Sequence, residues 1–136
     1  MLGMTLALLL QVSAVGETKA QYNQAFQQAE ETGKPMLVLV GANWCPGCVT
    51  MKSSVMPRLV RSGKLRDVSY IEIDADTSIG GRMMRGGSIP QLIMYRKTRD
   101  GWKRSSLVGV QSESTIQSMV DKAVASQKEQ EGLAAN

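Results

Sequence analysis

Apolar and polar positions alternate along the chain with periods that predict helices and strands in succession. Residues 17–32 carry their apolar side chains at helical spacing, and Gly33 is placed to end that helix. After Pro35, the residues Met-Leu-Val-Leu-Val at 36–40 form a continuous apolar run. A short run with β-branched residues is typical of a strand that is buried on both faces inside a parallel sheet.

The rest of the chain predicts further elements of both kinds. A helix is expected to begin within residues 45–49 and to continue to Pro57, which must interrupt it or begin a new turn, because proline has no backbone N–H to donate. The remaining predicted elements are a strand at 68–74, a short helix at 77–85, strands at 91–95 and 103–108 joined around Asp100-Gly101, and a final helix that Ser112 caps and that frays after Gln127. This order predicts an α/β fold, with a central mixed sheet of about four strands flanked by helices on both faces.

The N-terminus differs in character from the rest of the chain. Residues 1–16 contain no charged side chain, and Leu2 to Leu10 form an apolar run that precedes the small-x-small pattern Val12-Ser13-Ala14. This pattern predicts a secretory signal peptide cleaved near Ala14 or slightly later, since the run is shorter than the ~20 residues that span a bilayer. A buried first strand or helix is the alternative.

The length of 136 residues suits one domain. We expect that domain at 17–128, followed by a frayed tail at 129–136. A cleaved signal would place the protein outside the cytoplasm, in the bacterial periplasm, where disulfide chemistry is possible. Without cleavage, the alternative location is the cytoplasm.

Composition narrows the chemistry. The chain has 16 Lys and Arg, 12 Asp and Glu and no histidine, which gives a formal net charge of +4. The absence of histidine excludes Cys-His nucleophilic catalysis and any histidine-based metal site. Only two tryptophans, three tyrosines and one phenylalanine are present and no recognition motif appears, so we expect no nucleic-acid partner.

The only two cysteines, Cys45 and Cys48, stand two residues apart directly after the first predicted strand. A structural zinc site needs four ligands, so these two would require carboxylates or a second subunit to complete it. A structural disulfide here would close a very small loop and would stabilise the fold only weakly. The third possibility is a redox pair.

The position of the pair favours the redox interpretation. Cys45 lies at the C-terminal end of a buried strand, where sites gather in open α/β sheets. It also lies at the start of a helix, where free backbone N–H groups favour a thiolate. Cys48 follows within one helical turn and is close enough to attack a mixed disulfide on Cys45. Pro46 suits the first helical turn, and Gly47 allows a partner's backbone to come close.

With these residues in view, the chain resembles the thioredoxin superfamily. The residues that carry the resemblance are Trp44-Cys45-Pro46-Gly47-Cys48, Ser88-Ile89-Pro90 and Val108-Gly109. The resemblance implies a thioredoxin-like fold in which Cys45 is the nucleophile and Cys48 is the resolving thiol.

The same resemblance assigns a substrate groove. It implies that Pro90 is preceded by a cis peptide bond beside the sulfurs and that the backbone of Ile89 pairs with an extended substrate segment. Trp44 and Ile89 would form the apolar contact surface, beside Pro46 and Gly47. Gly109 would keep the groove open.

Two positions depart from the thioredoxin pattern. The family's buried aspartate, six residues before the first cysteine, is replaced by Leu39, and a lysine on the neighbouring strand is replaced by Tyr70. The aspartate would assist proton transfer at the resolving thiol, so here we expect that proton to pass to solvent or to the partner's thiolate. The sequence therefore suggests a specialised relative.

The segment before the cysteines resembles secreted thioredoxin-like proteins and the periplasmic thioredoxin-like domain of membrane thiol reductases. This implies a monomeric thiol–disulfide oxidoreductase, more of a reductase than an oxidase. It would act on protein substrates with disulfides or thiols, with a membrane thiol reductase as a possible electron donor. No cofactor or metal is expected beyond the Cys45–Cys48 disulfide. The alternative is a non-catalytic binding module that holds a client in the Ile89-Pro90 groove.

Overall fold

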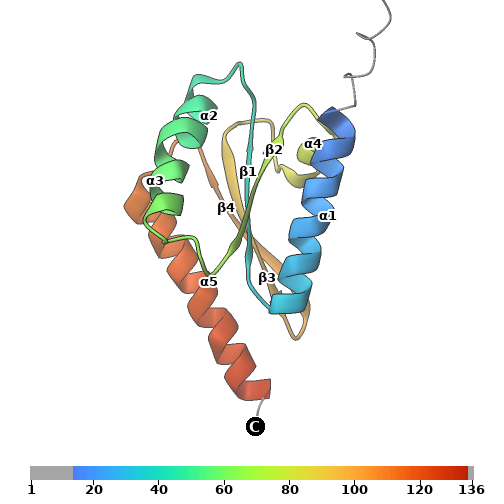
Figure 1. Ribbon diagram of the computed structural model, residues 1–136, viewed down its shortest axis with the longest axis vertical. Coiled ribbons are helices and arrows are strands. Elements are labelled where there is room, and N and C mark those ends of the chain that lie inside the picture. Colours follow the sequence, from blue (N-terminus) through green and yellow to red (C-terminus); the bar gives the residue numbers. More distant parts are fainter. Residues whose placement is uncertain (1–13, 135–136) are drawn as a thin grey trace, which may run out of the picture.

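The computed structural model describes residues 14–134, which form one mixed sheet covered by helices (Figure 1). In chain order the elements are α1 (Ala14–Thr32), β1 (Met36–Gly41), α2 (Pro46–Thr50), the π-helix η1 (Met51–Val55), α3 (Met56–Arg61), β2 (Ser69–Asp74), α4 (Ser78–Met83), β3 (Gln91–Thr98), β4 (Gly101–Val108) and α5 (Glu113–Ala134). The four-stranded sheet that was predicted is confirmed.

The strand order in the sheet is β2-β1-β3-β4. β1 pairs with β2 in parallel and with β3 antiparallel, and β3 and β4 form an antiparallel hairpin. β1 therefore lies inside the sheet, and its first five residues are all buried. A parallel pair needs a crossover, which α2, η1 and α3 supply between β1 and β2.

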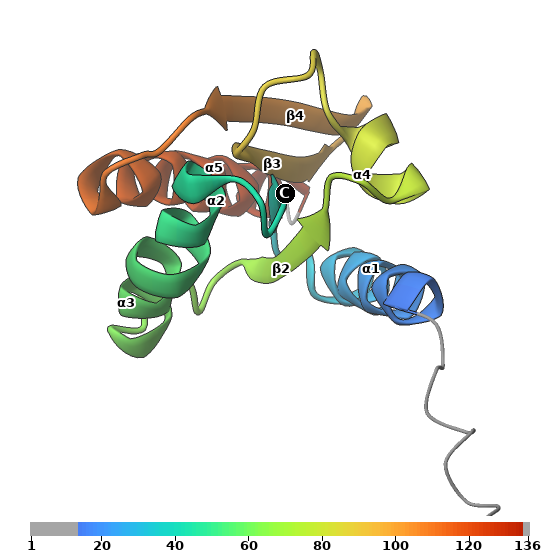
Figure 2. The same ribbon diagram turned by 90° about the horizontal axis from the view of Figure 1, so that it is seen from above.

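Side chains of β1 alternate between two cores, one on each face of the sheet. Leu37 and Leu39 pack with residues of η1, α3 and α5, whereas Val38 and Val40 pack with residues of α1 and α4. Figure 2 shows the two layers from above, with α3 and α5 at one side and α1 and α4 at the other. The apolar run of β1 is needed because both faces of this strand are covered.

The helix that begins at Pro46 is not broken at Pro57, which begins a new turn, the second of the two expected alternatives. The N–H of Met56 donates to the carbonyl of Met51, five residues back, which widens the turn into η1. Pro57 then occupies the first turn of α3, where a missing N–H costs nothing. The helix accommodates its proline by a π-turn and continues to Arg61.

Several element boundaries differ from those expected. The hairpin strands extend to Thr98 and back from Gly101, because polar residues continue the pairing beyond the apolar core. α4 ends at Met83, before the glycines of the following loop. α5 continues to Ala134, well past the fraying expected after Gln127, because its last residues are mostly good helix formers.

The proposed signal peptide lies mostly outside the described residues. Of the residues 1–16 assigned to it, only 14–16 are described, and they begin α1. Among the helices of residues 14–134, none is long and apolar enough to cross a membrane.

Candidate redox site

Cys45 is the N-cap residue of α2 at the end of the turn that follows β1. Its backbone is extended, with φ −100° and ψ 113°, while Pro46 occupies the first helical turn. The backbone N–H of Cys48 donates to Cys45 Sγ at 3.3 Å. Cys45 thus takes the place of the serine or aspartate that usually caps a helix, and its sulfur accepts one of the free N–H groups.

Three segments that are far apart in the sequence meet at Cys45. Its thiol donates to the carbonyl of Ile89 at a sulfur–oxygen distance of 3.8 Å. The Ile89–Pro90 peptide bond is cis. The carbonyl of Pro90 in turn accepts from the N–H of Gly109 at 2.8 Å. Cys45, Ile89, Pro90 and Gly109, singled out in the sequence, therefore belong to one site.

Cys48 lies deeper than Cys45 and is 4% exposed. Both thiols are free. Burial raises the pKa of Cys48 to about 11, and a hydrogen bond with Cys45 adds to the effect. At neutral pH Cys48 is therefore a protonated thiol.

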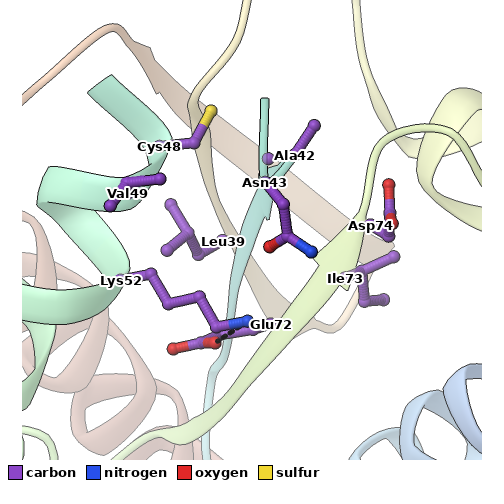
Figure 3. Close-up of a pocket in the computed structure, with 10 residues that line it drawn as sticks. Leu39, Ala42, Asn43, Cys48, Val49, Lys52, Glu72, Ile73 and Asp74 are labelled. Atoms are coloured by element: carbon purple, nitrogen blue, oxygen red, sulfur yellow. Dashed lines mark ion pairs between the residues drawn. The ribbon is translucent and has the colours of Figure 1, made fainter. Parts of the chain in front are cut away.

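A pocket of about 200 Å³ reaches Cys48 from the side of β2 (Figure 3). Cys48, Leu39 and the ion pair of Lys52 with Glu72 all contribute to its lining. Lys52 Nζ lies 3.7 Å from Glu72 Oε2, and the Tyr70 hydroxyl donates to Glu72 Oε1 at 2.9 Å. The pocket therefore brings one charged pair to the same cavity as Cys48.

Of the two departures from the thioredoxin pattern, Leu39 lines this pocket and Tyr70 contacts one of its lining residues, Glu72. Leu39 is buried in the core and lies opposite Glu72 in the strand pairing, so its side chain gives the pocket an apolar wall. Tyr70 is partly buried, and burial together with the neighbouring Glu72 raises its pKa. The charged residues that line the pocket are Lys52, Glu72 and Asp74, which sequence reasoning missed.

An apolar surface surrounds the cysteines. Trp44 is 69% exposed, and its indole N–H donates to Asp76 Oδ2 at 2.9 Å. Pro46 is also exposed, and Ile89 is half-buried. A Cβ on Gly47 would lie 3.0 Å from Val110 Cγ2 and 3.4 Å from Pro90 Cδ, so Gly47 keeps α2 close to this surface.

Gly109 adopts a backbone conformation that favours glycine. Its φ of +89° requires a residue tolerant of the left-handed region. A Cβ on this residue would project into open space, with no atom within 4 Å, so the expectation that Gly109 keeps the groove open stays a prediction. Gly109 shapes the turn after β4 that lets its N–H reach Pro90.

Among residues 14–134, no group of three or more acidic or cysteine side chains is arranged to hold a metal ion.

The sequence was compared with protein families and with known proteins. A protein-family model described as thioredoxin-like matches residues 17–96. No curated protein matches the chain.

Solved structures of thioredoxins are similar in fold. A thioredoxin from Thermus thermophilus is 20% identical, with a TM-score of 0.64 over 74% of this chain and 82% of that one. The thioredoxin of Trichomonas vaginalis is 24% identical, with a TM-score of 0.59 over 77% of this chain and 89% of its own. Trxlp from Edwardsiella tarda is 27% identical, with a TM-score of 0.55 over 72% of this chain and 92% of its own. Because the family match covers more than half of the sequence, the chain belongs to the thioredoxin-like family.

Proposed function

We propose that the protein is a thiol–disulfide oxidoreductase that acts on protein substrates through Cys45 and Cys48. The observation that carries the proposal is the difference between the two sulfurs. Cys45 caps α2, accepts the Cys48 N–H and lies beside Ile89, next to an exposed apolar surface. Cys45 is 8% exposed, and Cys48, at 4%, lies deeper behind it. Cys45 is therefore placed to react with a substrate, and Cys48 is placed to react with Cys45.

The reaction consists of two exchanges. The Cys45 thiolate attacks a substrate disulfide, forms a mixed disulfide and releases one substrate sulfur as a thiolate. Cys48 then passes its proton to solvent or to the released substrate thiolate and attacks Cys45 Sγ, which forms the Cys45–Cys48 disulfide and releases the second substrate sulfur as a thiolate. Two electrons pass from the protein to the substrate, and the reverse sequence would oxidise a dithiol substrate.

We place the protein in the bacterial periplasm and assign it the reducing direction. The apolar N-terminal run supports secretion, and the resemblance to the periplasmic domain of membrane thiol reductases supports a membrane electron donor. The reduction potential of the cysteine pair tests the direction. A value of about −270 mV or lower supports a reductase, whereas a value near about −120 mV would make the protein an oxidant.

Reduction of insulin by dithiothreitol tests the activity itself. The wild-type protein should accelerate precipitation of the insulin chains, and Cys45→Ser should abolish the acceleration. A wild-type protein that gives no acceleration, while still binding unfolded clients, would instead support the non-catalytic module that uses the Ile89-Pro90 groove.

A further inference from the structure

Gln91 is a buried polar residue that the redox chemistry does not use. It is the first residue of β3, follows Pro90 directly and is 1% exposed. Its amide Nε2 donates to the carbonyls of Arg85 and Ser88 at 2.9 and 3.0 Å, and its Oε1 accepts from the N–H of Arg85 at 3.3 Å. All three bonds go to the loop that joins α4 to β3, visible in Figure 2.

This loop, residues 85–88, has little else to order it. Gly86 and Gly87 are exposed, and a Cβ on either would meet no atom within 4 Å. In the described part of the chain, residues 85–88 make no backbone–backbone hydrogen bond. Ordering two glycines costs more conformational entropy than ordering other residues. The Gln91 amide therefore provides the main attachment of the loop.

The beginning of the same connection is also held from the sheet. Arg104 of β4 donates from Nη1 to the carbonyl of Met83, the last residue of α4, at 2.7 Å. Arg104 fixes the end of the helix, whereas Gln91 fixes the glycines that follow it. The two contacts act on different parts of the connection, so the loop itself depends on Gln91.

The loop leads directly into the residues beside Cys45. Ser88 precedes Ile89, whose carbonyl lies 3.8 Å from Cys45 Sγ. An extended client segment that pairs with the backbone of Ile89 would continue along Ser88 toward the glycines. If the loop is already ordered before binding, the free energy of binding does not include the entropy cost of ordering the loop.

We propose that Gln91 is a positioning residue that preorders the loop at residues 85–88 for extended polypeptide clients, and so selects protein disulfides over small-molecule disulfides. This inference rests on the proposed redox function. It assigns Gln91 no part in the exchange of electrons. Loss of its amide should weaken the binding of a polypeptide and leave the reactivity of Cys45 toward a small disulfide unchanged.

The test compares two substrates of the reduced protein. Gln91→Met keeps the length of the side chain and removes all three hydrogen bonds. We expect the KM for insulin to rise about tenfold, as a loss of about 1.4 kcal/mol in binding would give, with kcat within about twofold. The rate with Ellman's reagent, a small aromatic disulfide, should stay within about twofold of the wild-type rate.

A second substitution tests whether loop order is the cause. Gly87 does not have positive φ, so Gly87→Ala in the Gln91→Met background should restrict the loop without a clash and recover part of the KM. Gly86→Ala is the matched control, because its φ of +75° makes an alanine strained there, and it should not recover the KM.

The remaining outcomes separate the two proposals. An unchanged KM in Gln91→Met, or an equal loss of rate with insulin and with Ellman's reagent, would overturn the positioning role while leaving the redox function intact. A wild-type protein that reduces neither substrate would overturn the redox function and this inference together.

Discussion

Gly41 and Cys48 lie so close together that a Cβ on Gly41 would be 2.9 Å from Cys48 Cβ and 3.0 Å from Cys48 Sγ. Gly41 is the last residue of β1, and its carbonyl accepts from the N–H of Ala75 at 2.8 Å. That bond to the chain after β2 resists a shift of the strand away from the helix. The absence of a side chain at residue 41 is therefore part of how Cys48 is held in place.

Gly41→Ala should displace Cys48 and destabilise the protein. Overpacking of this kind costs about 1–3 kcal/mol, and closure of the Cys45–Cys48 disulfide should slow because the sulfur no longer faces Cys45. Urea unfolding and the rate of disulfide closure measure the two effects. The matched control is Gly132→Ala, an exposed helical position with no atom within 4 Å of the added Cβ. Equal behaviour of the two variants would show that Cys48 tolerates the methyl group.

Alanine substitutions at the two adjacent glycines of α4, Gly80 and Gly81, should change the free energy of unfolding in opposite directions. A Cβ on Gly80 would lie 2.1 Å from the carbonyl oxygen of Asp74, which is backbone and cannot yield easily. Gly80→Ala should therefore lower the free energy of unfolding by more than about 1 kcal/mol. A Cβ on Gly81 would be 3.9 Å from its nearest neighbour, the carbonyl oxygen of Ala75. Gly81→Ala should therefore raise the free energy of unfolding by about 0.5–1 kcal/mol, because alanine has the higher helix propensity. Urea unfolding checks both signs, and a stabilised Gly80→Ala would contradict the close approach of α4 to β2.

The raised pKa of Cys48 makes the stability of the dithiol protein depend on pH. The ordinary pKa of a cysteine thiol is 9.0, and that of Cys48 in the folded protein is about 11. Between these two pH values the folded protein keeps the Cys48 proton while the unfolded chain loses it. The unfolded state then binds fewer protons, so the free energy of unfolding should fall as the pH rises through this window. Well below pH 9 this thiol is protonated in both states, so it does not make the free energy of unfolding depend on pH.

Urea unfolding of the reduced protein and of Cys48→Ser at pH 8 and pH 10.5 isolates this contribution. Other groups titrate in the same range, so the informative quantity is the difference between the two proteins. We expect the wild type to lose more stability than the variant over this interval. Parallel losses would contradict the raised pKa.

The hydrogen bond from Trp44 to Asp76 should matter for client binding more than for stability. It holds an indole that is 69% exposed and would otherwise adopt several rotamers. We expect Asp76→Ala to raise the KM for insulin a few-fold and to change the free energy of unfolding by less than about 1 kcal/mol. Asp76→Asn keeps an acceptor oxygen and serves as the control. An unchanged KM in Asp76→Ala would assign the bond no role in docking.

Much of the fold followed from local patterns. The uninterrupted apolar run of β1 required cover on both faces of the sheet, and Pro57 marked the position where the helix would be disturbed. The length of α5 was missed because its last turns carry polar residues, whose helix propensity is high although they bury little surface. The hairpin strands were predicted too short for a similar reason, since pairing continues where burial does not.

The two cysteines and Pro90 could be found from sequence because their spacing is distinctive. Gln91, Asp76 and the Lys52–Glu72 pair could not, because each gains its role from a partner distant in the chain. One signal was available for Gln91, a polar residue at the head of the apolar run Leu92-Ile93-Met94. Gly41 offered a similar signal, as a glycine that ends a buried strand just before the cysteines.

Trapping of mixed disulfides tests the central claim, that Cys45 attacks and Cys48 resolves, most directly. Reduced Cys48→Ser is mixed with a client protein that carries a disulfide, and the products are separated without reductant and identified by mass spectrometry. We expect Cys48→Ser to accumulate a disulfide between Cys45 and the client, and Cys45→Ser to accumulate none. Equal trapping by the two variants, or trapping by Cys45→Ser alone, would contradict the assignment.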